Sequence, residues 1–173
     1  MVLLVDHHDV VDLVELLRVR LRRELAAERG RLEVAAALQT WGVAAADLIQ
    51  RDGSGLSRYD YVTAAALVTI LAHVDHDAVL RGPFEASLPI AGRDGTLANR
   101  MKGTAAEGNA RAKTGSMSNV RGVSGYVTSA AGEPLVFSIL ANNFEVPGPT
   151  ITAAEDAIIV RLATFGRTPA STR

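Results

Sequence analysis

Two apolar runs separated by a short turn constrain the fold of this chain more than any other feature. Gly122 to Thr128 and Leu135 to Ala141 are rich in apolar, β-branched and aromatic residues, and the segment between them reads Ser-Ala-Ala-Gly-Glu-Pro. Two such runs joined by a turn that contains Gly and Pro predict a β-hairpin. A short strand is predicted before it at Arg111 to Gly115, and a terminal helix after it at Thr150 to Phe165.

The residues before these strands predict mainly helices. In Val10 to Glu28, apolar residues recur at steps of three and four, which predicts an amphipathic helix that Gly30 is expected to end. A second helix is expected from Leu32 to Trp41, where Gly42 stops it, and a buried helix from Thr63 to Val74. The remaining expectations are a short strand or an extended entry into the next loop at Asp47 to Gln50, and a short helix at Thr96 to Met101. The fold class is therefore α/β, with antiparallel strands packed against helices.

Composition limits the classes of function. The 173 residues fit a single domain, 1–173, and the net charge of −1 gives no field that would attract nucleic acid. The absence of cysteine excludes disulfides and thiolate metal sites. The apolar opening is interrupted at Asp6 to Asp9, too early for a signal peptide, so we expect the chain as written to carry none.

The segment 110–119, Ala-Arg-Ala-Lys-Thr-Gly-Ser-Met-Ser-Asn, combines the polar groups that suit a bound carboxylate. Lys113 supplies a charge, Thr114 and Ser116 supply hydroxyl donors, and Gly115 allows a ligand to approach the backbone closely. Arg111 is expected to point to the other side of the same strand. Taken alone, Lys-Thr-Gly is a weak signal that favours an exposed strand end followed by a turn.

A second candidate segment is the loop Asp52-Gly-Ser-Gly-Leu-Ser-Arg58. Its glycines favour a tight loop with positive φ, and this exposes Leu56. The alternative interpretation is a turn that caps the next helix, which Asp60 could begin by accepting a backbone N–H bond.

These segments follow the order of known motifs. With Leu88-Pro-Ile-Ala-Gly-Arg-Asp-Gly-Thr-Leu97 and Val123-Ser-Gly-Tyr-Val127 between and after them, the chain resembles the D-alanyl-D-alanine carboxypeptidase/endopeptidase family, the class C low-molecular-mass penicillin-binding proteins. The resemblance runs from about Asp47 to Phe165 and indicates a carboxy-terminal fragment of the penicillin-recognising fold.

The resemblance implies a site and a location. Lys113 and Ser116 would be catalytic, with Lys113, Thr114 and Ser116 holding the terminal carboxylate and the Ser116 N–H in the oxyanion hole. The substrate-binding residues would be Thr114, Gly115, Met117, Leu56 and Arg58. The implied partners are peptidoglycan muramyl peptides and, in full-length relatives, β-lactams; the family acts in the periplasm or elsewhere outside the cytoplasmic membrane. No metal or cofactor and no nucleic acid are implied.

The nucleophile motif of this family is missing. No Ser-x-x-Lys occurs in the chain, and where the resemblance expects Ser-x-Asn the sequence reads His7-His8-Asp9-Val10. We therefore expect this chain alone to be inactive, and a non-catalytic binding or interaction module remains the alternative. Without an amino-terminal neighbour, the strand at Leu135 to Ala141 would also be an exposed sheet edge, which predicts self-association.

The residue types present are compatible with two other chemistries. His73-Val-Asp-His-Asp77 together with His7-His8-Asp9 contains ligand types for zinc or iron, but no spacing ties the two groups together. A Ser-His-Asp hydrolase is disfavoured because neither Ser54 nor Ser116 stands in a Gly-x-Ser-x-Gly setting.

Overall fold

The computed structural model describes residues 7–166, and the side chains of residues 20, 22 and 24–166. The chain forms two compact units, Met1–Tyr61 and Val62–Arg173, and each is described by itself. The prediction of a single domain stays a prediction. Within residues 7–166, no helix combines the length and the apolar character needed to cross a membrane.

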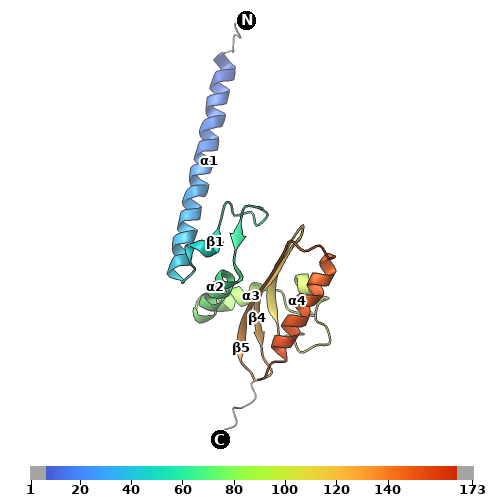
Figure 1. Cartoon of the computed structure of the whole chain (residues 1–173). Helices are drawn as coiled ribbons and strands as arrows, with labels where there is room; N and C mark the ends of the chain where they lie inside the picture. Colours follow the sequence, from blue (N-terminus) through green and yellow to red (C-terminus); the bar gives the residue numbers. More distant parts are fainter. Residues whose placement is uncertain (1–6, 167–173) are drawn as a thin grey trace. The chain divides into compact units, whose positions relative to one another are not determined.

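The first unit is built on one long helix, α1 (His7–Thr40) (Figure 1). The prediction that Gly30 ends a first helix is wrong, because an interior glycine costs a helix only about 1 kcal/mol and the flanking residues are good helix formers. Gly42 does end the helix, as predicted, with φ of 92°. Its N–H donates to the Gln39 carbonyl and that of Val43 donates to the Leu38 carbonyl, which closes the last turn. The predicted apolar face before residue 20 lies outside the described side chains.

A small two-stranded sheet follows α1. A short 3₁₀ turn, η1 (Ala45–Asp47), leads into β1 (Leu48–Ile49), which pairs with β2 (Tyr61–Val62). The strand predicted at 47–50 is thus present in shortened form, and the glycine loop 52–58 connects the two strands.

The second unit contains the predicted hairpin inside a three-stranded antiparallel sheet, in the order β3 (Arg111–Met117), β4 (Val120–Thr128) and β5 (Pro134–Asn142). Lys113 lies opposite Ser124, and Ser124 lies opposite Ser138. The terminal helix α4 (Gly148–Ala163) is also confirmed. Figure 1 shows α4 lying along this sheet.

The two faces of the sheet differ in composition. One face, called here the α4 face, packs against Ile159 and Ala163 of α4 and is apolar. The other, the α2 face, carries Tyr126, whose hydroxyl donates to the Leu71 carbonyl at 2.8 Å. Because side chains alternate along a strand, the register assigns every position to one face. The α4 face has Ala112, Thr114, Val123, Val127 and Phe137; the α2 face has Arg111, Lys113, Ser124, Tyr126 and Val136.

Two helices precede the sheet. The predicted buried helix is α2 (Ala64–His76), and its N-cap is Thr63, whose hydroxyl accepts from the Ala66 N–H at 3.0 Å. The expectation that Asp60 begins this helix is wrong, since Asp60 accepts from the backbone N–H of Arg51 instead. The short helix α3 (Arg81–Ser87) is not among the elements that the sequence predicts.

The segment 88–110 has almost no regular structure but fills much of the core. Leu97, Ala91 and Ala106 are fully buried. The only regular piece is the 3₁₀ turn η2 (Gly95–Leu97), shorter than the helix predicted at 96–101. Backbone hydrogen bonds fix the segment beside the start of β3. The Ala91 N–H donates to the Ala110 carbonyl at 2.9 Å, and the Ala112 N–H donates to the Pro89 carbonyl at 3.0 Å. This segment, called here the core loop, is therefore held in one position beside β3.

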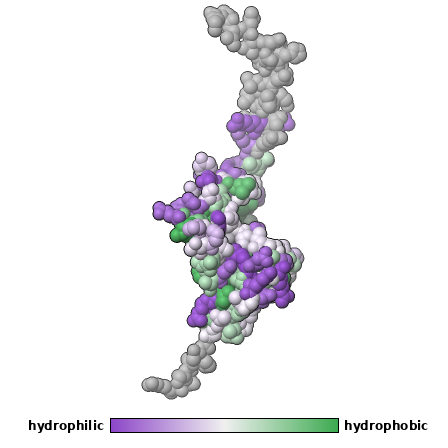
Figure 2. All heavy atoms as spheres, turned by 90° about the vertical axis from the view of Figure 1, so that its right-hand side faces the viewer, coloured by the Kyte–Doolittle hydropathy of each residue, from purple (hydrophilic) through white to green (hydrophobic). Residues whose placement is uncertain are grey.

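The surface of this unit mixes polar and apolar residues. Figure 2 shows hydrophilic residues interspersed with hydrophobic ones over it. Val79 and Ile158 are among the exposed large hydrophobic side chains. Single exposed apolar residues are normal for a folded protein and indicate no site.

A buried ion pair fixes α4 to the core loop. Arg100 donates to Asp156 at 2.8 Å and to Glu155 at 3.1 Å, and Glu155 is 2% exposed. Burial raises the pKa of Glu155 above its ordinary value, although Arg100 opposes the shift. A raised pKa in the folded state stabilises the protein below the ordinary glutamate pKa, and this stability is lost as the pH rises through the folded value.

We expect Glu155→Gln to reduce this loss of stability with rising pH, because the neutral amide carries no charge to bury. Chemical denaturation between pH 4 and 8 measures it, with the exposed Glu145→Gln as the control. An unchanged slope of the unfolding free energy against pH in Glu155→Gln would contradict the assignment.

Candidate active site

The side chains of the Lys-Thr-Gly segment divide between the two sides of β3. Lys113 and Met117 lie on the α2 face, whereas Thr114 and Ser116 lie on the α4 face. Lys113 and Ser116 are exposed and Thr114 is half-buried. A ligand that contacts side chains from both faces of β3 must therefore lie along the edge of this strand.

That edge of β3 is open. In the sheet order β3-β4-β5, β4 covers one side of β3. The Ala112 N–H points away from β4, because it donates to Pro89. Outward N–H groups recur at every second residue of an antiparallel strand, so those of Thr114 and Ser116 also point away from β4. Within the described part of the chain neither has a partner on that side. Two backbone donors are thus available along the edge.

Lys113 brings its charge to the same edge. Its ammonium donates to the Thr114 carbonyl oxygen at 2.6 Å. An ammonium has three donors, so this bond leaves two for a ligand. The arrangement places a positive charge beside the outward N–H groups.

The glycines near this edge serve different purposes. A side chain at Gly125 would collide with the Arg111 carbonyl, and one at Gly122 would come within 2.9 Å of Leu140. Around Gly115, in contrast, no atom outside residues 114–116 lies within 4 Å of the position that a Cβ would take. The fold therefore does not require glycine at 115, and its missing side chain leaves space on the α2 face of this outer strand, between Lys113 and Met117.

The hydroxyl of Thr114 has a side-chain partner that the sequence did not reveal. It lies 2.9 Å from the hydroxyl of Thr96, in η2. Thr96 belongs to the segment Leu88 to Leu97 that carried the family resemblance, but no pattern in the sequence distinguished it.

The other predicted binding residues, Leu56 and Arg58, belong to the first unit. Leu56 is 72% exposed, and Gly55 has the expected positive φ, 70°. Asp52 accepts from the backbone and the hydroxyl of Ser54 at 2.8 and 2.7 Å. Both bonds lower the pKa of Asp52 below its ordinary value, and the bond from the Ser54 hydroxyl has the larger effect. The loop is therefore a fixed turn with an outward leucine.

The structure thus brings five of the predicted residues together, Lys113 to Met117, on one strand. The expectation for Arg111 is wrong: residues two apart on a strand share a face, so Arg111 lies on the same side as Lys113. The roles assigned to the five residues, and to Leu56 and Arg58, stay predictions.

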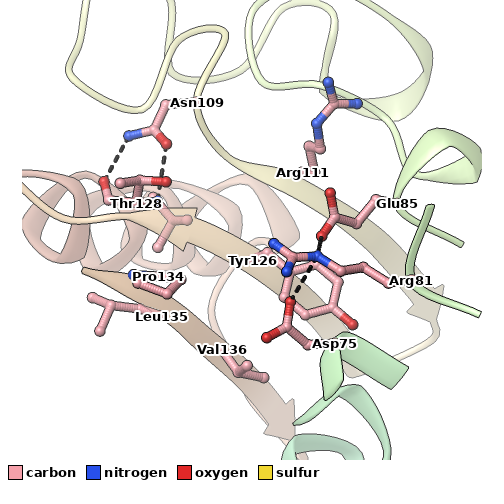
Figure 3. Close-up of a pocket in the computed structure, with 11 residues that line it drawn as sticks. Asp75, Arg81, Glu85, Asn109, Arg111, Tyr126, Thr128, Pro134, Leu135 and Val136 are labelled. Atoms are coloured by element: carbon pink, nitrogen blue, oxygen red, sulfur yellow. Dashed lines mark hydrogen bonds and ion pairs between the residues drawn. The ribbon is translucent and has the colours of Figure 1, made fainter. Parts of the chain in front are cut away.

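A pocket of about 150 Å³ opens on the α2 face, near the start of β3. Figure 3 shows Arg81 between Asp75 and Glu85, beside the ring of Tyr126. Arg81 lies 3.3 Å from Asp75 and 3.1 Å from Glu85. The pKa of Tyr126 is raised to about 12, mainly because the phenol is partly buried and also because Asp75 and Glu85 are negatively charged. Arg81 is paired with Asp75 and Glu85, and the Tyr126 hydroxyl is bonded to the backbone of α2. The polar groups that line this pocket therefore serve the packing of the helices against the sheet.

Two residues of the metal alternative, His76 and Asp77, make other contacts in the structure. No group of three or more potential metal-binding residues occurs among them. His76 contacts the Ala72 carbonyl at 2.6 Å, and Asp77 accepts from the N–H groups of Leu80 and Val79, which lower its pKa. Residues 7–9 lie outside the described side chains.

Comparison with known proteins gives one consistent family. The family model described as D-Ala-D-Ala carboxypeptidase 3 (S13) matches residues 12–165. The chain is 48% identical over 143 residues to the D-alanyl-D-alanine carboxypeptidase of Actinomadura sp. (strain R39), a match that covers 80% of this chain and 26% of that protein. The chain spans about a quarter of the length of the curated relatives it matches.

Solved structures agree. The crystal structure of penicillin binding protein 4 (dacB) from Haemophilus influenzae, complexed with a β-lactam, superposes with a TM-score of 0.69 at 28% identity; the match covers 79% of this chain and 33% of that one. The penicillin G-acylated Bd3459 endopeptidase from Bdellovibrio bacteriovorus gives a TM-score of 0.61 at 19% identity over 84% of this chain and 42% of that one, a likeness of fold alone.

Proposed function

The chain belongs to the D-Ala-D-Ala carboxypeptidase 3 (S13) family, and from this premise we propose that it forms the carboxylate-binding part of a serine-type D-alanyl-D-alanine carboxypeptidase/endopeptidase that acts on peptidoglycan stem peptides. The observation that carries the proposal is the open edge of β3. Lys113, the outward N–H of Ser116 and the space at Gly115 lie next to one another there.

Each group has a role in this proposal. Lys113 and the hydroxyls of Thr114 and Ser116 bind the terminal carboxylate, because charge-assisted bonds to an anion are the strongest that a protein offers. The Ser116 N–H stabilises the oxyanion that forms when the peptide carbonyl is attacked. Met117 contacts the rest of the stem peptide. For Leu56 and Arg58 of the first unit, a substrate-binding role is proposed from the family resemblance alone. The substrate lies outside the cytoplasmic membrane, and so does the site.

These 173 residues lack the Ser-x-x-Lys that would supply a nucleophile. This supports a second candidate, a module that binds the peptide carboxylate without turnover. In the enzyme, a serine carried outside these residues attacks the carbonyl, and the edge of β3 positions the substrate.

The test is incubation with a fluorescent penicillin. We expect the chain alone to form no covalent adduct, because no activated serine is present to open the β-lactam ring. Intact-mass spectrometry measures it, with a full-length relative as the positive control. A stoichiometric mass increase mapped to a serine of this chain would overturn the proposal that the nucleophile lies elsewhere.

We also propose that the chain self-associates. In the described residues β5 has a strand neighbour on one side only, and Leu135 to Leu140 is apolar except for Ser138. An unpaired apolar edge without lysine recruits other strands. Sedimentation over a concentration series is expected to show a rising mean mass, whereas a single monomeric species throughout would exclude it.

A further inference from the structure

Arg121 contacts several segments at the end of the sheet that carries the Lys-Thr-Gly motif. It lies opposite Ser116 in the pairing of β3 with β4, on the same α4 face. Its Nη1 donates to the carbonyls of Met117 and Val120 at 2.7 and 2.8 Å. Its guanidinium carbon lies 5.7 Å from the centroid of the Phe144 ring. One side chain thus connects both strands of the hairpin with the segment after β5.

The two carbonyls belong to the last pair of the β3–β4 ladder. Met117 pairs with Val120, and residues 118–119 form the turn between them. Two-residue turns that match the twist of a hairpin have positive φ at their first central residue. Here only the second of the two turn residues, Asn119, has positive φ, 55°. The turn itself therefore favours splayed strands, and the two bonds from Arg121 hold the closing pair together.

The start of α4 leaves space for the guanidinium. A Cβ at Gly148, the first residue of this helix, would lie 2.5 Å from Nη2 of Arg121. The side chain of Arg121 is half-buried, and its charge attracts Glu155 on α4 and lowers the pKa of that carboxyl. The turn, the Phe144 ring and the helix start therefore restrict the directions in which Arg121 can donate.

The two outward donors of β3 differ in what holds them. Near the start of the strand, the Ala112 N–H is bonded to the Pro89 carbonyl of the core loop. The Ser116 N–H is the outward donor nearest the turn, one residue before the carbonyl that Arg121 binds. A donor of an oxyanion hole acts only when it is preorganised, and a misplacement of about 1 Å can cost about 10²-fold in rate. The position of this N–H therefore depends on the turn.

We propose that Arg121 is a positioning residue for the oxyanion hole: by binding the carbonyls of Met117 and Val120, it fixes the direction of the Ser116 N–H. The inference rests on the proposed function, because that proposal assigns the Ser116 N–H to the oxyanion. It adds a residue of β4 to a site otherwise built on β3, and it separates the two outward donors, since Arg121 controls Ser116 and leaves Thr114 to the core loop.

NMR relaxation of backbone amides in this chain tests the positioning directly. In Arg121→Met, which removes the donors but keeps a long side chain, the order parameter of the Ser116 amide should fall from about 0.85 to about 0.6, the values of rigid and of flexible backbone. That of the Thr114 amide should not change. Arg121→Lys should restore the Ser116 value, because an ammonium can donate to the same two carbonyls. Arg161→Met is the matched control, the same change at an exposed arginine of α4.

The consequence for catalysis is measured in a protein that joins this chain to a segment carrying Ser-x-x-Lys. Arg121→Met is expected to lower the maximal rate of acylation by benzylpenicillin about 10-fold and to leave the dissociation constant of the initial complex unchanged. The reason is that the oxyanion exists only in the transition state, whereas Lys113 binds the carboxylate from the start. Gly148→Ala should give the same division between rate and binding, because its methyl group displaces the guanidinium without altering β3.

Thermal unfolding checks that each variant is folded. An unchanged Ser116 order parameter in Arg121→Met would overturn the inference, and so would equal losses of acylation rate and initial binding; in both cases the proposed carboxylate site stands. If the unaltered joined protein were not acylated at all, the proposed function would fall and the catalytic role of Arg121 with it.

Discussion

Lys113→Ala is expected to lower the rate of acylation by benzylpenicillin at least about 10²-fold in a protein that joins this chain to a segment carrying Ser-x-x-Lys. The substitution removes the ammonium that donates to the Thr114 carbonyl beside the outward N–H groups of β3, and a charge-assisted bond has an effect of this size once the bound substrate shields it from water. Stopped-flow measurement of acylation under single-turnover conditions gives the rate.

The chain offers a matched control for this prediction. Its other lysine, Lys102, is exposed and donates to the Asn99 side chain at 3.0 Å, away from β3. Lys102→Ala should leave the acylation rate nearly unchanged. Arg111→Ala is a stricter comparison, because Arg111 shares the face of Lys113 but lies two residues from it. Equal losses in Lys113→Ala and Arg111→Ala would mean that general positive charge, and no specific contact, accounts for the effect.

Local sequence signals predicted the parts of the fold that depend on neighbouring residues. The hairpin, the terminal helix and the stop at Gly42 all follow from patterns within about ten residues, and all are present. The strand that carries Lys113 is also predicted, at Arg111 to Gly115, and it is present as β3. That its outer edge is open is a finding of the structure.

Sequence reasoning missed two features for different reasons, one a local balance of helix energies and the other a contact between distant residues. Gly30 lies inside α1 because the cost of one glycine is small compared with the gain of a continuous helix. The bond between Thr114 and Thr96 joins residues 18 positions apart across an irregular loop. Such a loop has no periodicity, so nothing in the sequence predicts which of its hydroxyls faces the strand.

The glycines of the sheet allow the fold and the site to be tested separately. Gly125 lies opposite Ala112, and its Cβ would collide with the Arg111 carbonyl and lie 2.7 Å from Ala112 Cα. These are backbone atoms of β3, and β3 cannot retreat, because Ala112 is fully buried and bonded to Pro89. Gly125→Ala must therefore push the two strands apart, and we expect it to lower the free energy of unfolding by about 3 kcal/mol or more.

Gly115→Ala is the counterpart at the open edge. Since no atom outside residues 114–116 lies within 4 Å of its Cβ position, its unfolding free energy should change by less than about 1 kcal/mol. Its added methyl group occupies the space proposed for the ligand, so binding of N-acetyl-D-alanyl-D-alanine should fall although the fold is kept. Urea denaturation and NMR titration of both variants measure the two effects. If Gly115→Ala bound the dipeptide as well as the unaltered chain, the ligand would not approach β3 at this edge, whereas a fully stable Gly125→Ala would show that β3 and β4 can separate without loss.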